Sequence, residues 1–158
     1  ETSGETTVIS TWGTGPVADY CHVQWPCATS VQAGSETEPI YVWVFHGGTT
    51  NASGQGPGVR VEVGHGVDGS VPPDGDWTWF EAAYNEDKDG LTPGDLSNDE
   101  YQGAALAPGV PGVYDFAARV SVDSGATWTA CDLGGESCPG LGSDDGYDAG
   151  SAGELEVL

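Results

Sequence analysis

Positive charge and methionine are almost missing from this sequence. Its 158 residues include three Lys and Arg residues against 25 Asp and Glu, for a formal net charge of −22, and there is no Met. Nucleic acids and anionic membrane surfaces are bound chiefly through Lys and Arg. The composition therefore excludes both classes of partner, and it fits divalent cations or a saline environment better.

Membrane-spanning runs and familiar catalytic motifs are missing too. No apolar run is long enough to cross a bilayer, so we expect no membrane insertion. The sequence has no G-x-S-x-G elbow, no H-E-x-x-H motif and no phosphate-binding loop. Carboxylates are abundant, but that abundance follows from the composition and does not indicate acid–base chemistry. We expect a protein that is not an enzyme and that acts by binding.

Helical periodicity is the third absence. No amphipathic repeat of 3.6 residues persists for three turns, whereas 26 Gly and 10 Pro separate many short strand-like segments. This pattern predicts an all-β, two-sheet antiparallel sandwich in one domain covering residues 16–158. Residues 1–15 form an extension: Thr7–Trp12 has strand composition, and the Gly and Pro residues at positions 13–16 break it.

The segment Ile40–Phe45 is apolar on both faces. Ile40, Val42 and Val44 share one face by strict alternation, and Tyr41, Trp43 and Phe45 share the other. A sandwich strand normally has one wet face. We expect the N-terminal extension or a long loop to cover the aromatic face, and the alternative is an exposed aromatic platform for a ligand.

The stretch Trp77–Tyr101 predicts two strands around an acidic loop, Asn85–Glu100. Asn, Asp and Asp at alternate positions before Gly90 match the first half of a calcium loop. The second half departs from that motif, because Leu96 stands where a closing Glu belongs and Pro93 interrupts the run. We therefore predict a calcium site in a sandwich loop, with a solvated acidic hairpin as the alternative. The candidate ligands are Asn85, Asp87, Asp89, Asp95 and Asp99.

Aromatic residues near expected loop edges are candidates for stacking on sugar rings. Large aromatics within strands are more typical of a sandwich core, which is where we expect Trp43, Trp79 and Trp128. The candidate ligand-binding residues are Trp25, Trp77, Tyr84 and Tyr147.

Four cysteines in an acidic, Gly-rich β-protein indicate an oxidising compartment and two disulfides. Three pairings are possible from the residues alone. A zinc site is disfavoured because the spacings Cys21–Cys27 and Cys131–Cys138 are wider than in zinc knuckles. The chain begins at Glu1 and not at Met, so we interpret it as a mature secreted or cell-surface protein.

Several motifs in order resemble a family of secreted bacterial β-sandwich modules that look like starch-binding carbohydrate-binding modules. They are CHVQWP (21–26), IYVWV (40–44), GPGVRVEVGHG (56–66), WTWFEAAYN (77–85), NDEY (98–101), PGVYDFAARVSVDSGATWTACDLGG (111–135) and ELEV (154–157). The resemblance implies an immunoglobulin-like fold and a secreted location. It also implies that Cys21 and Cys131 lie on neighbouring strands, which leaves Cys27 to pair with Cys138. The local alternative pairs Cys21 with Cys27 and Cys131 with Cys138.

Two functional hypotheses follow. The first is a secreted, calcium-binding subunit that assembles with copies of itself into an extracellular filament or surface layer. Its extension would pair with the sheet edge of a neighbour. Its candidate assembly residues are Val8, Ile9 and Trp12 in the extension and Tyr41, Trp43 and Phe45 on the accepting face. The alternative is a glycan-binding module whose partner is a surface polysaccharide.

Overall fold

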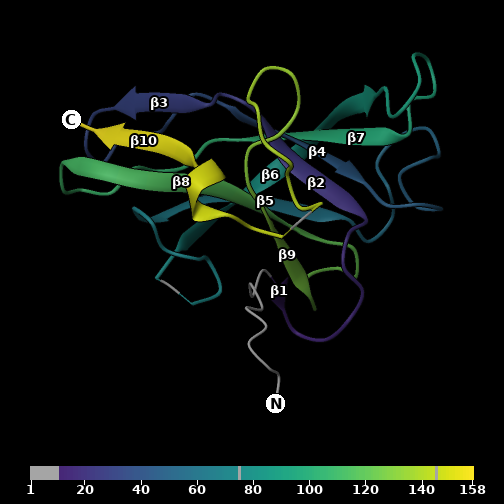
Figure 1. Ribbon diagram of the computed structural model, residues 1–158, viewed down its shortest axis with the longest axis horizontal. Helices are drawn as coiled ribbons and strands as arrows, with labels where there is room; N and C mark the ends of the chain where they lie inside the picture. The colour runs from purple at the N-terminus through teal and green to yellow at the C-terminus, as the bar shows by residue number, and fades with distance from the viewer. Residues whose placement is uncertain (1–10, 75, 145) are drawn as a thin grey trace.

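The fold is built from β-strands, as the computed structural model shows for residues 11–74, 76–144 and 146–158 (Figure 1). Within these residues the one helical element is a 3-10 turn, η1 (Ala149–Ser151). No helix in the described part is long and apolar enough to cross a membrane. The strands are β1 (Thr11–Trp12), β2 (Tyr20–Trp25), β3 (Ala28–Val31), β4 (Ile40–Phe45), β5 (Arg60–Val67), β6 (Thr78–Lys88), β7 (Asn98–Gly103), β8 (Gly112–Ser121), β9 (Trp128–Cys131) and β10 (Gly153–Val157).

These strands form two layers that are joined through β6. One layer has the order β1-β9-β8-β5-β6, with β10 paired to β8 and β3 paired to β10; the other has the order β6-β7-β4-β2. The long strand β6 pairs with β5 as far as Ala82 and with β7 from Ala83 onward, so the sheet curls over itself. Every pair of named strands is antiparallel except β3–β10. The expected all-β, immunoglobulin-like sandwich is confirmed.

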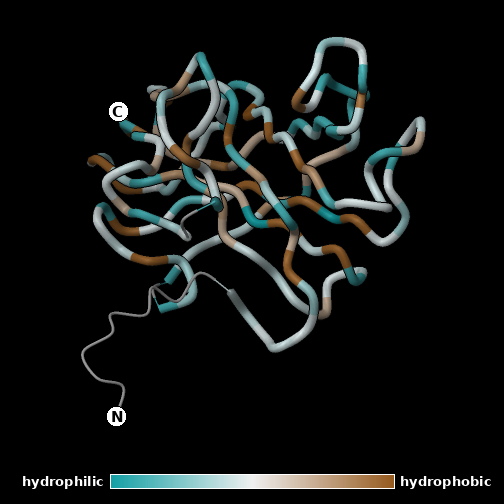
Figure 2. The backbone as a smooth tube through the Cα atoms, turned by 45° about the vertical axis from the view of Figure 1, so that its right-hand side comes forward, coloured by the Kyte–Doolittle hydropathy of each residue, from teal (hydrophilic) through white to brown (hydrophobic). Residues whose placement is uncertain are grey.

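The core lies between the layers and follows from the alternation along the strands. Ile40, Val42 and Val44 of β4 are fully buried, and they face apolar residues of β5 and β8 such as Val61 and Val120. Figure 2 shows hydrophobic residues along the crossing strands and hydrophilic residues mostly in the loops. Burying each such aliphatic side chain contributes about 1.5–3 kcal/mol, so this alternation fixes which face of β4 points inward.

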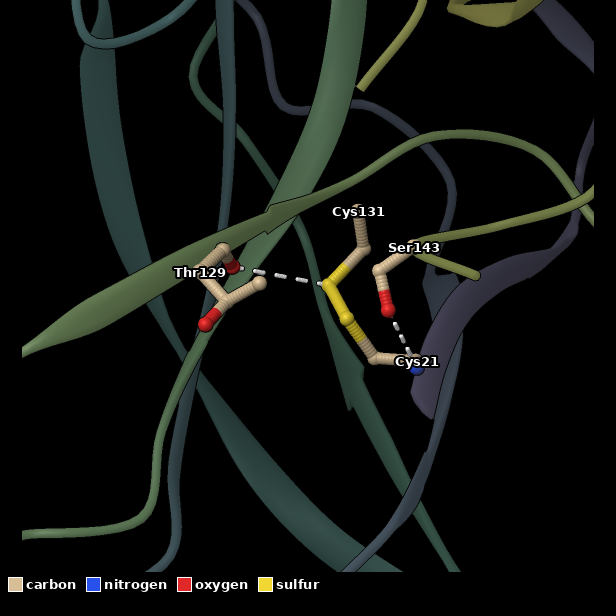
Figure 3. Close-up of a disulfide and its surroundings, with 4 residues drawn as sticks. All are labelled: Cys21, Thr129, Cys131 and Ser143. Carbon is tan, nitrogen blue, oxygen red and sulfur yellow. Dashed lines mark hydrogen bonds between the residues drawn. A yellow bond between two sulfur atoms is a disulfide. The ribbon is translucent and has the colours of Figure 1, made fainter. Parts of the chain in front are cut away.

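Two disulfides hold the open edge of the second layer to the first. Cys21 of β2 is bonded to Cys131 of β9, and Cys27 is bonded to Cys138, which confirms the pairing implied by the family resemblance. Figure 3 shows the first bond beside Ser143, whose hydroxyl accepts a hydrogen bond from the Cys21 amide at 3.0 Å. The strand β2 is thereby fixed against β9.

The described end of the N-terminal extension packs on its own domain. Thr11 and Trp12 form β1 and pair with β9, and the Trp12 ring meets Trp79 edge-on at 5.7 Å. The Arg119 guanidinium lies over both rings, 5.1 Å from Trp12 and 4.7 Å from Trp79. Trp12 is thus held within its own chain, whereas Val8 and Ile9 lie outside the described residues. Donation of this segment to a neighbouring subunit stays a prediction.

The acidic stretch is more strand-like than the sequence suggested. The strand β6 continues through Lys88 and β7 begins at Asn98, so the loop is limited to residues 89–97. Asn85, Asp87 and Asp99 belong to strands and not to the loop, which corrects the sequence-based boundary. The cross-strand pairing Asp87–Asp99 and Lys88–Asn98 extends the ladder past the point where charge alone predicted a turn.

Candidate functional site

Four ring side chains line one groove on the outer face of β2 and β4. Tyr20 pairs across the strands with Phe45, and His22 pairs with Trp43. The ring centroids are 5.2 Å apart for Tyr20–His22 and 5.5 Å apart for His22–Trp43. Because residues opposite each other on neighbouring strands share a face, these rings form one continuous aromatic floor. The groove above it has a volume of about 570 Å³.

The loop 89–97 forms one wall of the groove and is organised by Asp95. Its carboxylate accepts hydrogen bonds from the Gly90 amide and from the amides and hydroxyls of Thr92 and Ser97. These donors hold the pKa of Asp95 well below its usual range, with the Gly90 amide the largest contributor. The Asp89 carboxylate likewise accepts from the Gly94 amide at 2.8 Å. The loop is therefore closed by its own hydrogen bonds.

The loop that follows β4 also lines the groove, and it is hydrogen-bonded to loop 89–97. The hydroxyl of Thr50, which is fully buried, donates to the Ser97 carbonyl at 2.8 Å and accepts from the His46 amide at 2.9 Å. Asn51 lines the groove, and its side-chain oxygen accepts from the Gly48 amide. In Figure 1 the two loops project from the same end of the sandwich.

The orientation of the Trp43 ring is fixed by residues of the neighbouring strands β6 and β7. Its indole N–H donates to the Glu100 carboxylate at 2.7 Å, and the Asn85 amide donates to the other oxygen of the same carboxylate at 2.7 Å. Trp43 and Glu100 are directly opposite each other on β4 and β7. A ring held in place before binding costs less entropy to order when a ligand arrives.

His22 lies in the floor as an uncharged ring. It is 5% exposed, and neither ring nitrogen has a hydrogen-bond partner among the residues that the structure describes. Burial lowers the pKa of His22 to about 4, so the ring is neutral at pH 7. The loop after β9 packs closely here, because a Cβ atom at Gly134 would lie 2.7 Å from the His22 Cβ atom. His22 thus contributes an uncharged ring to the floor.

Two facing carboxyl groups, the buried Asp99 and the half-buried Asp87, lie beside the loop 89–97. Asp99 is fully buried opposite Asp87, and its carboxylate accepts from the Gly56 amide at 2.8 Å. Asp87 accepts from the Gly54 amide and, at 2.7 Å, from the Tyr84 hydroxyl. Burial, together with the neighbouring Asp87 charge, raises the pKa of Asp99 to about 6. The pair holds residues 54–56 against β6 and β7.

The predicted calcium ligands fall into three separate places. Asp87 and Asp99 face each other, Asp89 and Asp95 close the hairpin loop, and Asn85 binds Glu100. Within the described ranges, no group of three or more His, Cys, Asp and Glu side chains is gathered closely enough to hold a metal ion. The calcium site stays a prediction.

The aromatic residues singled out from the sequence are scattered, and two assignments are corrected. Tyr147 is 2% exposed and packs edge-on to Trp77, so it is a core residue and not a loop-edge platform. Trp43 was expected in the core, yet it lines the groove, because alternation with the buried valines turns it outward. Trp25 is half exposed, but it lies outside the groove lining.

The remaining aromatic candidates have structural contacts. Trp77 stacks on Trp79 with ring centroids 5.4 Å apart, and Tyr84 packs edge-on to Tyr101 at 5.8 Å. Sequence reasoning did not assign Tyr20 or His22 to any site. It named Phe45 and Trp43 for assembly, and the structure places both beside Tyr20 and His22 in the groove.

Comparison with known proteins gives one partial match. No family model matches the chain. An alignment over 107 residues, which covers 58% of this chain, shows 30% identity to an amylopullulanase, a glycoside hydrolase from Thermoanaerobacterium thermosulfurigenes. The match covers 5% of that enzyme's length, so it is similarity to a small part of a large protein. Together with the all-β fold, it loosely fits a module of the carbohydrate-binding type.

Proposed function

We propose that this chain is a non-catalytic glycan-binding module and that the aromatic groove is its binding site. The observation that carries the proposal is the floor of four rings, Tyr20, His22, Trp43 and Phe45, presented on the outer faces of two paired strands. Sugar rings present C–H groups on their faces, and aromatic side chains bind such faces through apolar contact. The amide and carboxylate groups in the walls supply partners for sugar hydroxyls.

Two further observations support a glycan over other ligands. The groove is open along one side of the sandwich and combines an apolar floor with a polar rim, which suits a molecule with apolar faces and hydroxyl edges. The partial match to an amylopullulanase and the family resemblance both favour starch-type glucans as the first ligands to test.

The geometry favours this function over the filament hypothesis for the same surface. Phe45 and Trp43 were named as an apolar face that a neighbouring subunit covers. They lie instead beside two polar loops, in a groove that Asp89 and Asp95 also line. A strand added by another subunit needs an unpaired sheet edge, whereas this surface is the face of a sheet.

The test is binding of soluble starch and pullulan by affinity electrophoresis, followed by calorimetry with linear maltooligosaccharides. Trp43→Ala should weaken binding at least about tenfold, because it removes the largest ring of the floor. Trp25→Ala is the matched control: this Trp is half exposed on β2 yet outside the groove, so its loss should leave affinity unchanged.

Phe45→Ala provides a second variant that leaves the Trp43–Glu100 hydrogen bond in place. Melting curves and far-ultraviolet circular dichroism establish that each variant is folded. The proposal is wrong if no starch-type glucan binds the native chain, or if Trp43→Ala and Trp25→Ala behave alike.

A further inference from the structure

All three Lys and Arg side chains are paired with carboxylates, and Lys88 also lies 3.9 Å from the Glu100 carboxylate that holds the Trp43 ring. Arg60 is paired with Glu81 and Arg119 with Glu62, at 2.8 and 2.7 Å, and Lys88 is paired with Glu86 at 2.7 Å. These are the three Lys and Arg residues of the sequence, and none of them lines the groove. His22 is neutral, as its burial dictates. A ligand in the groove therefore meets no positive charge from the lining.

The groove continues past Tyr20 and Leu91 into a second hollow of about 460 Å³, which Gly140, Leu141 and Asp144 also line. Leu91, at the junction of the two hollows, is fully exposed. A continuous path of this kind accommodates a stretch of polysaccharide chain better than a single sugar. Its lining carries carboxylates at Asp89, Asp95 and Asp144.

Building on the proposed function, we infer that this extended groove selects uncharged stretches of glycan and rejects polysaccharides that carry carboxylate or sulfate groups. Asp95 is a fixed negative charge, because its oxygens are saturated by donors of its own loop. Asp89 and Asp144 set the charge on either side of Leu91, and they are the specificity-determining residues. A carboxylate on the ligand within reach of them is repelled with no cation to offset it.

The expected discrimination is about fivefold or more at low ionic strength, from a ligand charge held some 6–8 Å from two carboxylates in a partly aqueous site. Salt should remove most of it, since the Debye length falls from about 20 Å at 20 mM to about 4 Å at 0.5 M. Neutral glycan binding should be nearly independent of salt.

The test uses soluble starch and carboxymethyl starch prepared from the same parent polymer, at 20 mM and 500 mM NaCl. The native chain should bind soluble starch equally at both salt concentrations and carboxymethyl starch at least about fivefold more weakly at low salt. The double variant Asp89→Asn, Asp144→Asn should lose this discrimination, measured as the ratio of its affinities for the two polymers at 20 mM NaCl.

The matched control is Glu154→Gln, Glu156→Gln, which removes the same charge from exposed positions of β10. It should retain the discrimination, which separates a local effect of the groove from the overall charge of −22. Equal binding of both polymers at low salt, or equal effects of the two double variants, overturns the selectivity and leaves the proposed function standing. Failure of soluble starch itself to bind overturns both.

Discussion

Replacing Asp99 by Asn should change how the stability of this protein depends on pH. Asp99 is fully buried, its partner across the strands is Asp87, and its pKa is raised from 3.8 to about 6. An acid whose pKa is higher in the folded state stabilises the fold below its unfolded pKa, and that stability is lost as the pH rises through the folded pKa. An Asn amide can donate to Asp87 as the protonated carboxyl does, and its oxygen can still accept from Gly56.

The magnitude follows from the two pKa values. A change from 3.8 to about 6 corresponds to about 3 kcal/mol of free energy of unfolding when complete, at about 1.4 kcal/mol for each pH unit. Between pH 4 and pH 7 the native protein should lose about 2 kcal/mol through this residue. The Asn variant, which does not titrate, should lose none of it.

Urea unfolding with the disulfides intact, at several pH values from 4 to 8, measures this difference. The contributions of other titrating groups cancel when the free energy of unfolding of the variant is subtracted from that of the native protein. His22, whose pKa is lowered to about 4, acts in the opposite direction, and burial raises the pKa of Asp115 to about 6, in the same direction as Asp99. A difference between variant and native protein that stays constant across this range would refute the reasoning about the buried pair.

The remaining predictions concern crosslinks, calcium and the extension. With Cys21–Cys131 intact, Cys27–Cys138 closes an additional ring of only about 13 residues, so replacing Cys27 and Cys138 by Ala should cost about 3 kcal/mol in urea unfolding and not the 4–5 kcal/mol of an isolated 111-residue separation. If calcium binds the acidic hairpin, excess chelator at moderate ionic strength should lower the melting temperature. An unchanged melting curve would contradict calcium binding and would mean that the loop is ordered by its own hydrogen bonds. If the extension is donated to a neighbouring subunit, deleting residues 1–15 should abolish salt-promoted assembly in light scattering and electron microscopy; undiminished assembly would contradict strand donation.

The fold was predictable because local and global signals agree in this chain. Period-two alternation in Ile40–Phe45 identified a strand with the observed bounds and the buried face that it has in the structure. The four cysteines and the family resemblance gave both disulfides. The β6–β7 hairpin was the exception, since its charge resembled a loop although Asp87 and Asp99 form part of the ladder.

The site was harder to predict, because a groove depends on what covers a surface. Alternation says that Tyr41, Trp43 and Phe45 share a face, but it does not say which neighbouring segment lies over them. The covering segment was expected to be the extension or a long loop. In the structure β1 pairs with β9 in the other layer, and loop 89–97 stands beside the rings as a wall. Which segment lies over a given face is determined by pairing between strands that are far apart in the sequence, and the local residue pattern does not encode that pairing.

One signal in the sequence would have located the floor. A bond from Cys21 to Cys131 between the two layers means that the Cys21 side chain points inward. Because side chains alternate along a strand, Tyr20 and His22 then point outward. On the other strand, the side chains of Ile40, Val42 and Val44 point inward. Those of Trp43 and Phe45 therefore point outward in the same way. Once β2 and β4 are paired, two outward pairs of rings must lie together on one face, whatever the loops do. An aromatic binding face in a β-sandwich is therefore indicated by two features together. One is an inward disulfide cysteine flanked by aromatic residues, and the other is a neighbouring strand of alternating aliphatic and aromatic residues.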